Sequence, residues 1–205
     1  MARDNDNVIV IDGYEGTGKS NLAIVINKCL VKDFDPGQEA IFSVQDWNRI
    51  FDVGATCRAY QIDEAGNLLF SRDYASTDSK FLVKLLMQAR ILKSTIVLCL
   101  PNIGWLEKYV REHRVRYRIH MFSRTSAMLQ RGIVNWRTGE ARFEDIGKFT
   151  GIPSARALWP DLWNSYEARK IAAVKAFSGD HQQQLRLNKL SQQARIKKLE
   201  AELDN

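Results

Sequence analysis

A glycine-rich octapeptide near the N-terminus has the residue types and spacing of a phosphate-binding loop. Residues 13–20 fit the pattern G-x-x-x-x-G-K-[ST] at every fixed position. The glycines allow successive backbone N–H groups to point at phosphate oxygens, the lysine reaches the β- and γ-phosphates, and the serine hydroxyl ligates Mg²⁺. The residues expected to bind ATP and Mg²⁺ are therefore Gly13, Tyr14, Glu15, Gly16, Thr17, Gly18, Lys19 and Ser20.

Two carboxylates follow a second apolar segment. Residues 59–62 read Ala-Tyr-Gln-Ile, and Asp63 and Glu64 come next. At this Walker B position of P-loop ATPases, Asp63 would hold Mg²⁺ alongside Ser20. Glu64 points to a different face, so it can orient and polarise an attacking water without ligating the metal. A glutamate beside the metal-binding aspartate indicates hydrolysis rather than phosphoryl transfer to a small acceptor.

Alternating strand and helix patterns surround these residues through about the first 120 positions, which predicts a three-layer α/β fold with a mostly parallel central sheet. The loop lies between a β-branched strand at 8–11 and an amphipathic helix at 19–30. Further strands are expected at 39–42, 58–62, 95–100 and 115–122, helical segments at 45–51, 78–92 and 103–113, and a hairpin at 133–136 and 140–143.

The strand at 95–100 is expected to lie between the loop strand and the Walker B strand. It ends at Pro101 and Asn102, so the Asn102 side chain would lie beside the γ-phosphate as a catalytic sensor. The alternative is that Asn102 caps the helix that begins at Ile103, because asparagine is a favoured N-cap.

The pattern changes after residue 150, so we expect a motor domain at 1–150 and a small helical C-terminal extension at 151–205. Residues 166–177 read as a helix. Residues 181–205 are rich in Gln, Lys, Arg and Leu, and they fit a solvated tail, an oligomerisation helix or a basic arm on nucleic acid. Residues 141–153 also show a weak similarity to the start of a helix-turn-helix.

The amino-acid composition indicates which kind of partner the protein binds and in which cellular compartment it works. The net charge of +6 over 205 residues favours a polyanionic partner, with nucleic acid as the leading candidate. Cys29, Cys57 and Cys99 are scattered and odd in number, which argues for a reducing compartment and against a zinc site. No apolar stretch could span a bilayer and the N-terminus is polar, so we expect a cytoplasmic protein.

The chain resembles the FtsK/HerA superfamily of DNA-pumping ATPases over about residues 8–122, because three segments follow one another in the order found in that family. These segments are Leu-Leu-Met-Gln-Ala-Arg at 85–90, the strand that ends in Leu-Pro-Asn at 100–102, and the basic stretch at 109–120. Zonular-occludens-toxin-type proteins and the packaging ATPases of membrane-containing viruses belong to this broader group. The resemblance implies a RecA/FtsK-like ATPase that assembles as a hexameric or pentameric ring around double-stranded DNA.

In such a ring, an arginine of one subunit completes the ATP site of its neighbour. Arg90 matches the helix arginine of the family best, and Arg114, Arg116 and Arg118 are further candidates. The family commonly has glutamine at the sensor position, where this chain has Asn102.

The absence of a large accessory domain favours a minimal viral genome-packaging motor, with capsid-vertex or membrane proteins as possible partners. Three alternatives remain open. They are a morphogenesis or secretion ATPase with a separate membrane partner, a nucleotide-gated scaffold that assembles through residues 181–205, and a small-molecule kinase.

Overall fold

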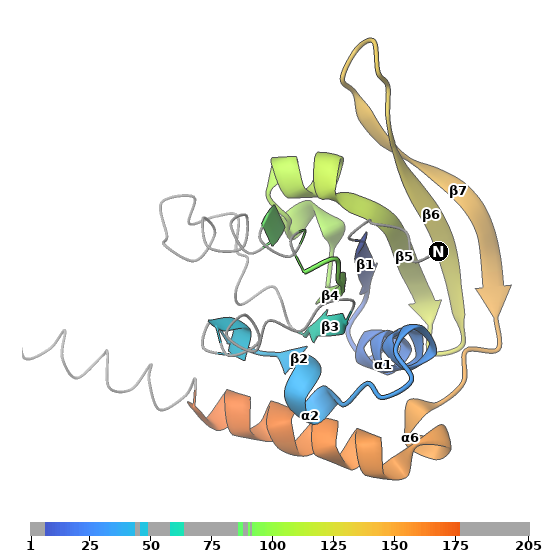
Figure 1. Cartoon of the computed structure of the whole chain (residues 1–205). Helices are drawn as coiled ribbons and strands as arrows, with labels where there is room; N and C mark the ends of the chain where they lie inside the picture. Colours follow the sequence, from blue (N-terminus) through green and yellow to red (C-terminus); the bar gives the residue numbers. More distant parts are fainter. Residues whose placement is uncertain are drawn as a thin grey trace, which may run out of the picture. The chain divides into compact units, whose positions relative to one another are not determined.

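The computed structural model describes residues 7–43, 46–48, 58–63, 86–87, 90 and 92–176. Within them lies a seven-stranded sheet in the order β2-β3-β4-β1-β5-β6-β7, parallel from β2 to β5 and antiparallel from β5 to β7 (Figure 1). The strands are β1 Asn7–Gly13, β2 Ala40–Ile41, β3 Ala59–Ile62, β4 Thr95–Leu100, β5 Val115–Ser123, β6 Ser126–Val134 and β7 Ala141–Thr150. The helical elements are α1 Lys19–Leu30, α2 Pro36–Glu39, the 3₁₀ turn η1 Ile103–Trp105, the π-helical turn η2 Val110–Arg114 and α6 Ala155–Leu158. Residues 160–176 are also largely helical.

The chain divides into two compact units, residues 1–166 and residues 167–205. The first unit includes residues beyond 150, and the boundary of the motor domain at residue 150 stays a prediction. Among the described residues, no helix is long and apolar enough to cross a membrane.

Strand β4 lies between β1 and β3, as the sequence analysis predicted. Asn7 of β1 pairs with Thr95, and the register continues to Asp12 and Leu100. Both strands have a central aliphatic run, residues 8–11 in β1 and 96–98 in β4, which suits strands that are buried on both faces of a parallel sheet. As a result, the carboxyl ends of β1, β3 and β4 meet at one edge of the sheet, where the predicted loop and carboxylates follow.

Two apolar layers cover this sheet because successive side chains of a strand point to opposite faces. One layer packs the odd-numbered positions of β1 and β4 against α1, and its members include Ile11, Val97, Cys99, Leu22 and Ala23. The other packs the even-numbered positions against the segment after β4, and its members include Val10, Ile96, Leu98, Leu106 and Val110. The described residues thus form the expected three-layer arrangement.

The segment after β4 differs from the single helix predicted at 103–113. It forms η1 and η2 instead, because Leu106 adopts extended backbone angles and ends the first turn. The second turn begins where Glu107 accepts a hydrogen bond from Val110 N at 3.1 Å.

The strand predicted at 39–42 shrinks to two residues because α2 precedes it. Asp35 caps that helix by accepting a hydrogen bond from Gly37 N, and Pro36 occupies its first turn. The helix predicted at 78–92 lies mostly outside the described residues, as do parts of the turn expected at 45–51.

The predicted hairpin is much longer than expected, since β6 and β7 pair from Ser126 and Thr150 to Val134 and Ala141. It extends beyond the rest of the first unit in Figure 1, and β7 is exposed along most of its length. The weak helix-turn-helix similarity at 141–153 is wrong, because β7 forms a backbone ladder with β6 through Thr150.

Candidate nucleotide-binding site

The glycine-rich loop lies between β1 and α1, as predicted, and its backbone requires glycine at key positions. Gly13 has φ of 139°, and a Cβ there would lie 2.6 Å from Met121 O of the adjoining strand β5. Gly18, at the N-terminus of α1, has φ of 87° in the left-handed region. The backbone therefore has the tight turn that a phosphate cradle needs, and the N-terminus of α1 opens onto it.

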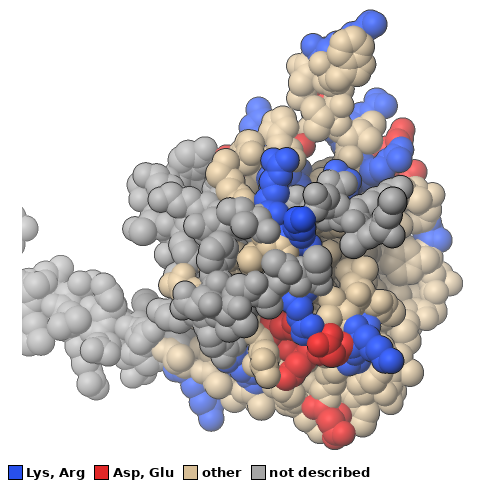
Figure 2. All heavy atoms as spheres, in the orientation of Figure 1, with Lys and Arg blue, Asp and Glu red and all other residues tan. Residues whose placement is uncertain are grey.

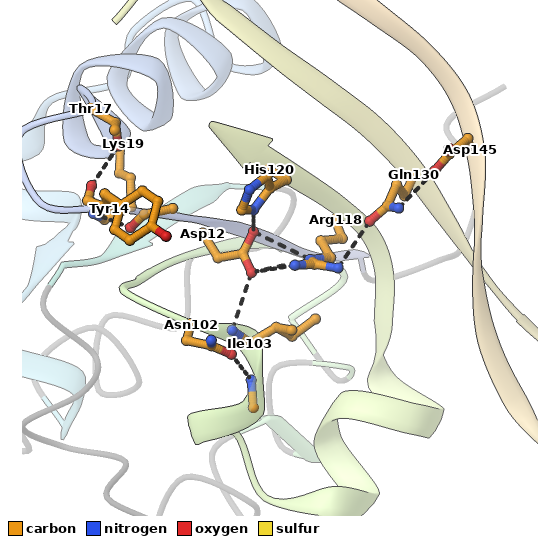
Figure 3. A network of polar contacts seen from close by, with 12 residues as sticks. Asp12, Tyr14, Thr17, Lys19, Asn102, Ile103, Arg118, His120, Gln130 and Asp145 are labelled. Atoms are coloured by element: carbon orange, nitrogen blue, oxygen red, sulfur yellow. Dashed lines mark hydrogen bonds and ion pairs between the residues drawn. The ribbon is translucent and has the colours of Figure 1, made fainter. Parts of the chain in front are cut away.

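Lys19 folds back over this loop (Figure 3). Its ammonium donates to Gly13 O and Tyr14 O, each at 2.9 Å, and the Thr17 hydroxyl donates to Tyr14 O at 2.7 Å. Phosphate oxygens are stronger acceptors for an ammonium group than neutral carbonyls. The lysine is thus held at the loop where a phosphate would attract it, while Tyr14 and Glu15 are exposed at the rim.

Ser20 and Asp63, the two residues predicted to bind the metal, lie within hydrogen-bonding distance of each other. The Ser20 hydroxyl, in the first turn of α1, donates to the Asp63 carboxylate oxygens at 3.0 and 3.2 Å. Asp63 follows β3 and is only 3% exposed. A hydroxyl and a carboxylate are hard oxygen ligands that fit Mg²⁺, so these two residues would hold it, and the bound ion would neutralise phosphate charge. Glu64 lies outside the described residues, and its catalytic role stays a prediction.

Tyr166 is a site residue that the sequence analysis missed. Its hydroxyl donates to Asp63 Oδ2, and its side chain is buried. Burial, followed by the nearby charge of Asp63, raises the pKa of Tyr166 well above its usual value, so the phenol is a neutral donor. Only the aromatic character of residues 159–166 could have indicated a role in packing, and no local pattern connects that stretch to Asp63.

Arg124 was also missed. It lies in the turn between β5 and β6, and its Nε donates to Gly16 O at 3.1 Å. Its backbone passes close to Gly18, with Arg124 Cα 3.7 Å from the position of a Cβ there. An exposed guanidinium group therefore lies on the rim of the phosphate-binding loop in the same chain.

Asp12, the residue before the loop, is the centre of a buried polar network (Figure 3). It is 1% exposed and accepts hydrogen bonds from Arg118 Nη2 at 2.7 Å and Nε at 3.1 Å. Its other contacts are His120 Nδ1 at 2.9 Å and Ile103 N at 3.2 Å. One carboxylate thus connects the end of β1 to β5 and to the segment after β4.

Asn102 acts as an N-cap, because its Oδ1 accepts a hydrogen bond from Gly104 N at 2.7 Å. Pro101 O accepts a hydrogen bond from Gly13 N at 3.3 Å, so the residues before Asn102 are attached directly to the phosphate-binding loop. The cap uses only the oxygen of the amide. A sensor would use the Nδ2 donor, so both roles fit one side chain, and the sensor role stays a prediction.

The candidate arginines lie in different places. Arg90 precedes β4 and Arg114 precedes β5, so both lie at the edge of the sheet opposite the loop. Arg90 is exposed, whereas Arg114 Nη2 donates to Leu86 O at 2.7 Å. Arg118 is engaged with Asp12, and Arg116 is exposed at the start of β5.

The described residues thus have the fold of a P-loop NTPase, with the loop after β1, the inserted strand β4 and an aspartate after β3.

No protein-family model matches the chain, and no curated protein does. Solved structures with a similar course of the chain include the N-terminal domain of zonular occludens toxin from Neisseria meningitidis, with 14% identity over 70% of this chain and 94% of that chain and a TM-score of 0.42. The cytoplasmic domain of the Thermomonospora curvata type VII secretion ATPase EccC is 13% identical over 74% of this chain and 24% of that chain, with a TM-score of 0.45. The FIGL-1 AAA domain in complex with ADP is 17% identical over 56% and 42%, with a TM-score of 0.37.

Proposed function

We propose that this protein is a Mg²⁺-dependent ATPase. The observation that carries the proposal is the direct hydrogen bond between Ser20 of the glycine-rich loop and Asp63 at the end of β3. These residues are far apart in the sequence, and the fold brings together the two oxygen ligands that a Mg²⁺–nucleotide site needs. The geometry of the loop and the position of Lys19 support the same function.

Each residue has a defined task in this proposal. Lys19 and the loop N–H groups bind the phosphates, and bound Mg²⁺ would stabilise the charge that develops on them. Glu64 orients the attacking water and takes up its proton. Asn102 donates a hydrogen bond from Nδ2 to that water or to the γ-phosphate, while its Oδ1 keeps the cap on η1.

We further propose that the chain works as a homo-oligomeric ring that moves double-stranded DNA, as a viral genome-packaging motor would. The segment order from 85 to 120 supports it. So do the positions of Arg90 and Arg114, because Arg90 precedes β4 and Arg114 precedes β5, and six strand residues span about 20 Å between that edge of the sheet and the loop of the same chain. Either residue could therefore complete an ATP site only on a neighbouring subunit.

The charges on the visible face do not by themselves identify the DNA path. Figure 2 shows described Lys and Arg side chains from the hairpin to the lower part of the molecule, with a group of Asp and Glu side chains beside them. Contacts to DNA phosphates would be independent of sequence and sensitive to salt.

ATP hydrolysis by the purified protein, measured with and without double-stranded DNA, tests both proposals, and the oligomer mass is measured in parallel. We expect Mg²⁺-dependent hydrolysis that DNA stimulates, with the stimulation falling between about 50 and about 200 mM salt. Glu64→Gln should lower kcat by about 100-fold or more while ATP binding remains.

Lys19→Ala should lower kcat by about 100-fold, because it removes a preorganised phosphate ligand. Lys32→Ala is the matched control, since Lys32 is exposed beyond the other end of α1. Hydrolysis that does not respond to DNA at low salt would refute translocation but leave the ATPase intact. If the unaltered protein shows no Mg²⁺-dependent hydrolysis, or if Lys19→Ala hydrolyses ATP equally and the activity therefore does not come from the glycine-rich loop, the ATPase proposal is wrong.

A further inference from the structure

Tyr166 lies in the interior of the first unit, at the carboxyl-terminal end of the segment that follows β7. Its side chain is 2% exposed. Its ring packs against Phe42 and Trp163, at centroid distances of 6.1 and 5.4 Å. The ring is therefore held by aromatic packing as well as by burial.

That hydroxyl meets the proposed metal ligand Asp63. Tyr166 donates to Oδ2, and Ser20 donates to Oδ1 at 3.0 Å. The carboxylate therefore has a hydroxyl donor from each of two elements, α1 and the segment after β7. A carboxylate has about four lone-pair positions, so these bonds orient the group and leave acceptor capacity for a cation or its water.

The segment that carries Tyr166 is attached to the phosphate-binding helix at a second point. Asn21, the residue after Ser20, donates from Nδ2 to Pro153 O at 2.8 Å. Its Oδ1 accepts a hydrogen bond from Ala155 N at 2.7 Å. The segment 153–166 thus contacts α1 next to Ser20, the first proposed metal ligand. It contacts Asp63, the second proposed ligand, directly. The positions of both proposed ligands therefore depend on this segment.

We propose that Tyr166 is a positioning residue for the metal of this site, and that it sets Mg²⁺ affinity by holding the Asp63 carboxylate in its binding orientation. This inference rests on the proposed function, because it assumes that Ser20 and Asp63 bind Mg²⁺ with a nucleotide. Hydrogen bonds from outside the ligand set orient metal-binding carboxylates, and their loss typically costs about 10- to 100-fold in metal affinity. A fixed carboxylate also loses less rotational freedom when it takes up the ion.

The test is Tyr166→Phe, which removes the hydroxyl and keeps the ring. Mn²⁺ binding is measured by electron paramagnetic resonance in the presence of a non-hydrolysable ATP analogue, and analogue binding is measured separately in EDTA. We expect Mn²⁺ affinity to fall by about 10-fold or more. Binding of the analogue in EDTA should not change, since the loop is intact.

Two further variants separate positioning from packing. Tyr117→Phe makes the same chemical change on β5, where Tyr117 pairs with Ile9 away from the loop, and should leave Mn²⁺ affinity unaltered. Trp163→Phe disturbs the ring contact of Tyr166 without removing its hydroxyl, and should have a smaller effect than Tyr166→Phe. An equal loss of Mn²⁺ affinity in Trp163→Phe and Tyr166→Phe would overturn the proposal, as would unaltered affinity in Tyr166→Phe.

The outcome distinguishes this inference from the proposed function. If the unaltered protein binds the analogue with Mn²⁺ and Tyr166→Phe binds both equally well, only the inference fails. If the unaltered protein binds neither, the proposed function fails. Should Tyr166→Phe not fold, ¹⁹F NMR of protein that contains 3-fluorotyrosine gives a second measurement. The Tyr166 resonance should move when Mg²⁺ joins the bound analogue, and a stationary resonance would refute the coupling.

Discussion

Replacing Asp12 with asparagine, which exchanges one carboxylate oxygen for an NH₂ group, should destabilise the protein strongly. Asp12 accepts hydrogen bonds from Arg118, His120 and Ile103 N with a side chain that is almost completely buried. Asparagine has the same shape but carries no charge, and it presents an NH₂ group where the carboxylate had only acceptors. That NH₂ group would face the Arg118 guanidinium, the His120 ring or Ile103 N.

The expected cost follows from the loss of one partner of a buried ion pair, which is about 3–5 kcal/mol. The Arg118 side chain is 23% exposed, so water can solvate part of the guanidinium group after the change. We therefore expect a loss at the lower end, about 3 kcal/mol, against a total stability of about 5–15 kcal/mol. With an m-value of about 1–3 kcal/mol/M, the urea midpoint should fall by about 1 M or more.

Urea unfolding of Asp12→Asn, Arg118→Gln and the double variant provides the assay. The double variant should be less destabilised than the sum of the single variants, with a coupling energy of about 0.5–3 kcal/mol. Asp145→Asn is the matched control, because Asp145 is exposed and receives a hydrogen bond from Gln130 at the outer end of the same network. A loss below about 1 kcal/mol in Asp12→Asn, or additive effects in the cycle, would refute this reasoning.

Three further changes test other contacts. Arg124→Ala should weaken binding of an ATP analogue by about 10-fold, because it removes a guanidinium group from the loop beside Gly16. Titration with the analogue measures this loss, and equal affinity would contradict a role of Arg124 in binding. Asn102→Asp keeps the oxygen of the cap but removes the amide donor, so we expect kcat to fall by about 100-fold without a change in thermal stability, and an unaltered kcat would exclude the sensor role. The hydrogen bond from Arg58 lowers the pKa of Asp33, so its stabilising effect is present above the unfolded pKa of about 4 and is lost as the pH falls through the lower folded value. Arg58→Gln should return the pKa of Asp33 toward about 4 in an NMR titration, and an unmoved pKa would show that the pair has no effect.

Local patterns predicted the loop, its flanking elements and the proximity of Ser20 to Asp63. Glycines, lysine and serine at fixed spacing specify a backbone turn that few other sequences can form, and the aliphatic strands β1 and β4 specify buried parallel strands. The carboxylate pair after an apolar strand indicates the Walker B position. A glutamate at that position in turn predicted that β4 lies between β1 and β3.

Local patterns failed where competing short-range contacts decided the backbone. The Asn102 cap and the extended conformation at Leu106 divide one predicted helix into two short turns. The long hairpin was underestimated because β7 is largely exposed, so its residues lack the strict apolar alternation that marks a strand with one buried face.

The sequence by itself determined where the glycine-rich loop lies and predicted that Asp63 follows a buried strand, since those positions are fixed by short stretches of chain. Only the tertiary structure decided which distant side chains complete the site. Arg118 reaches Asp12 and Arg124 reaches Gly16 because β5 pairs with β1, and Tyr166 reaches Asp63 because the segment after β7 packs beside α1. The physical reason is that such contacts depend on strand register and on packing between elements, neither of which leaves a periodic signal around the residues concerned.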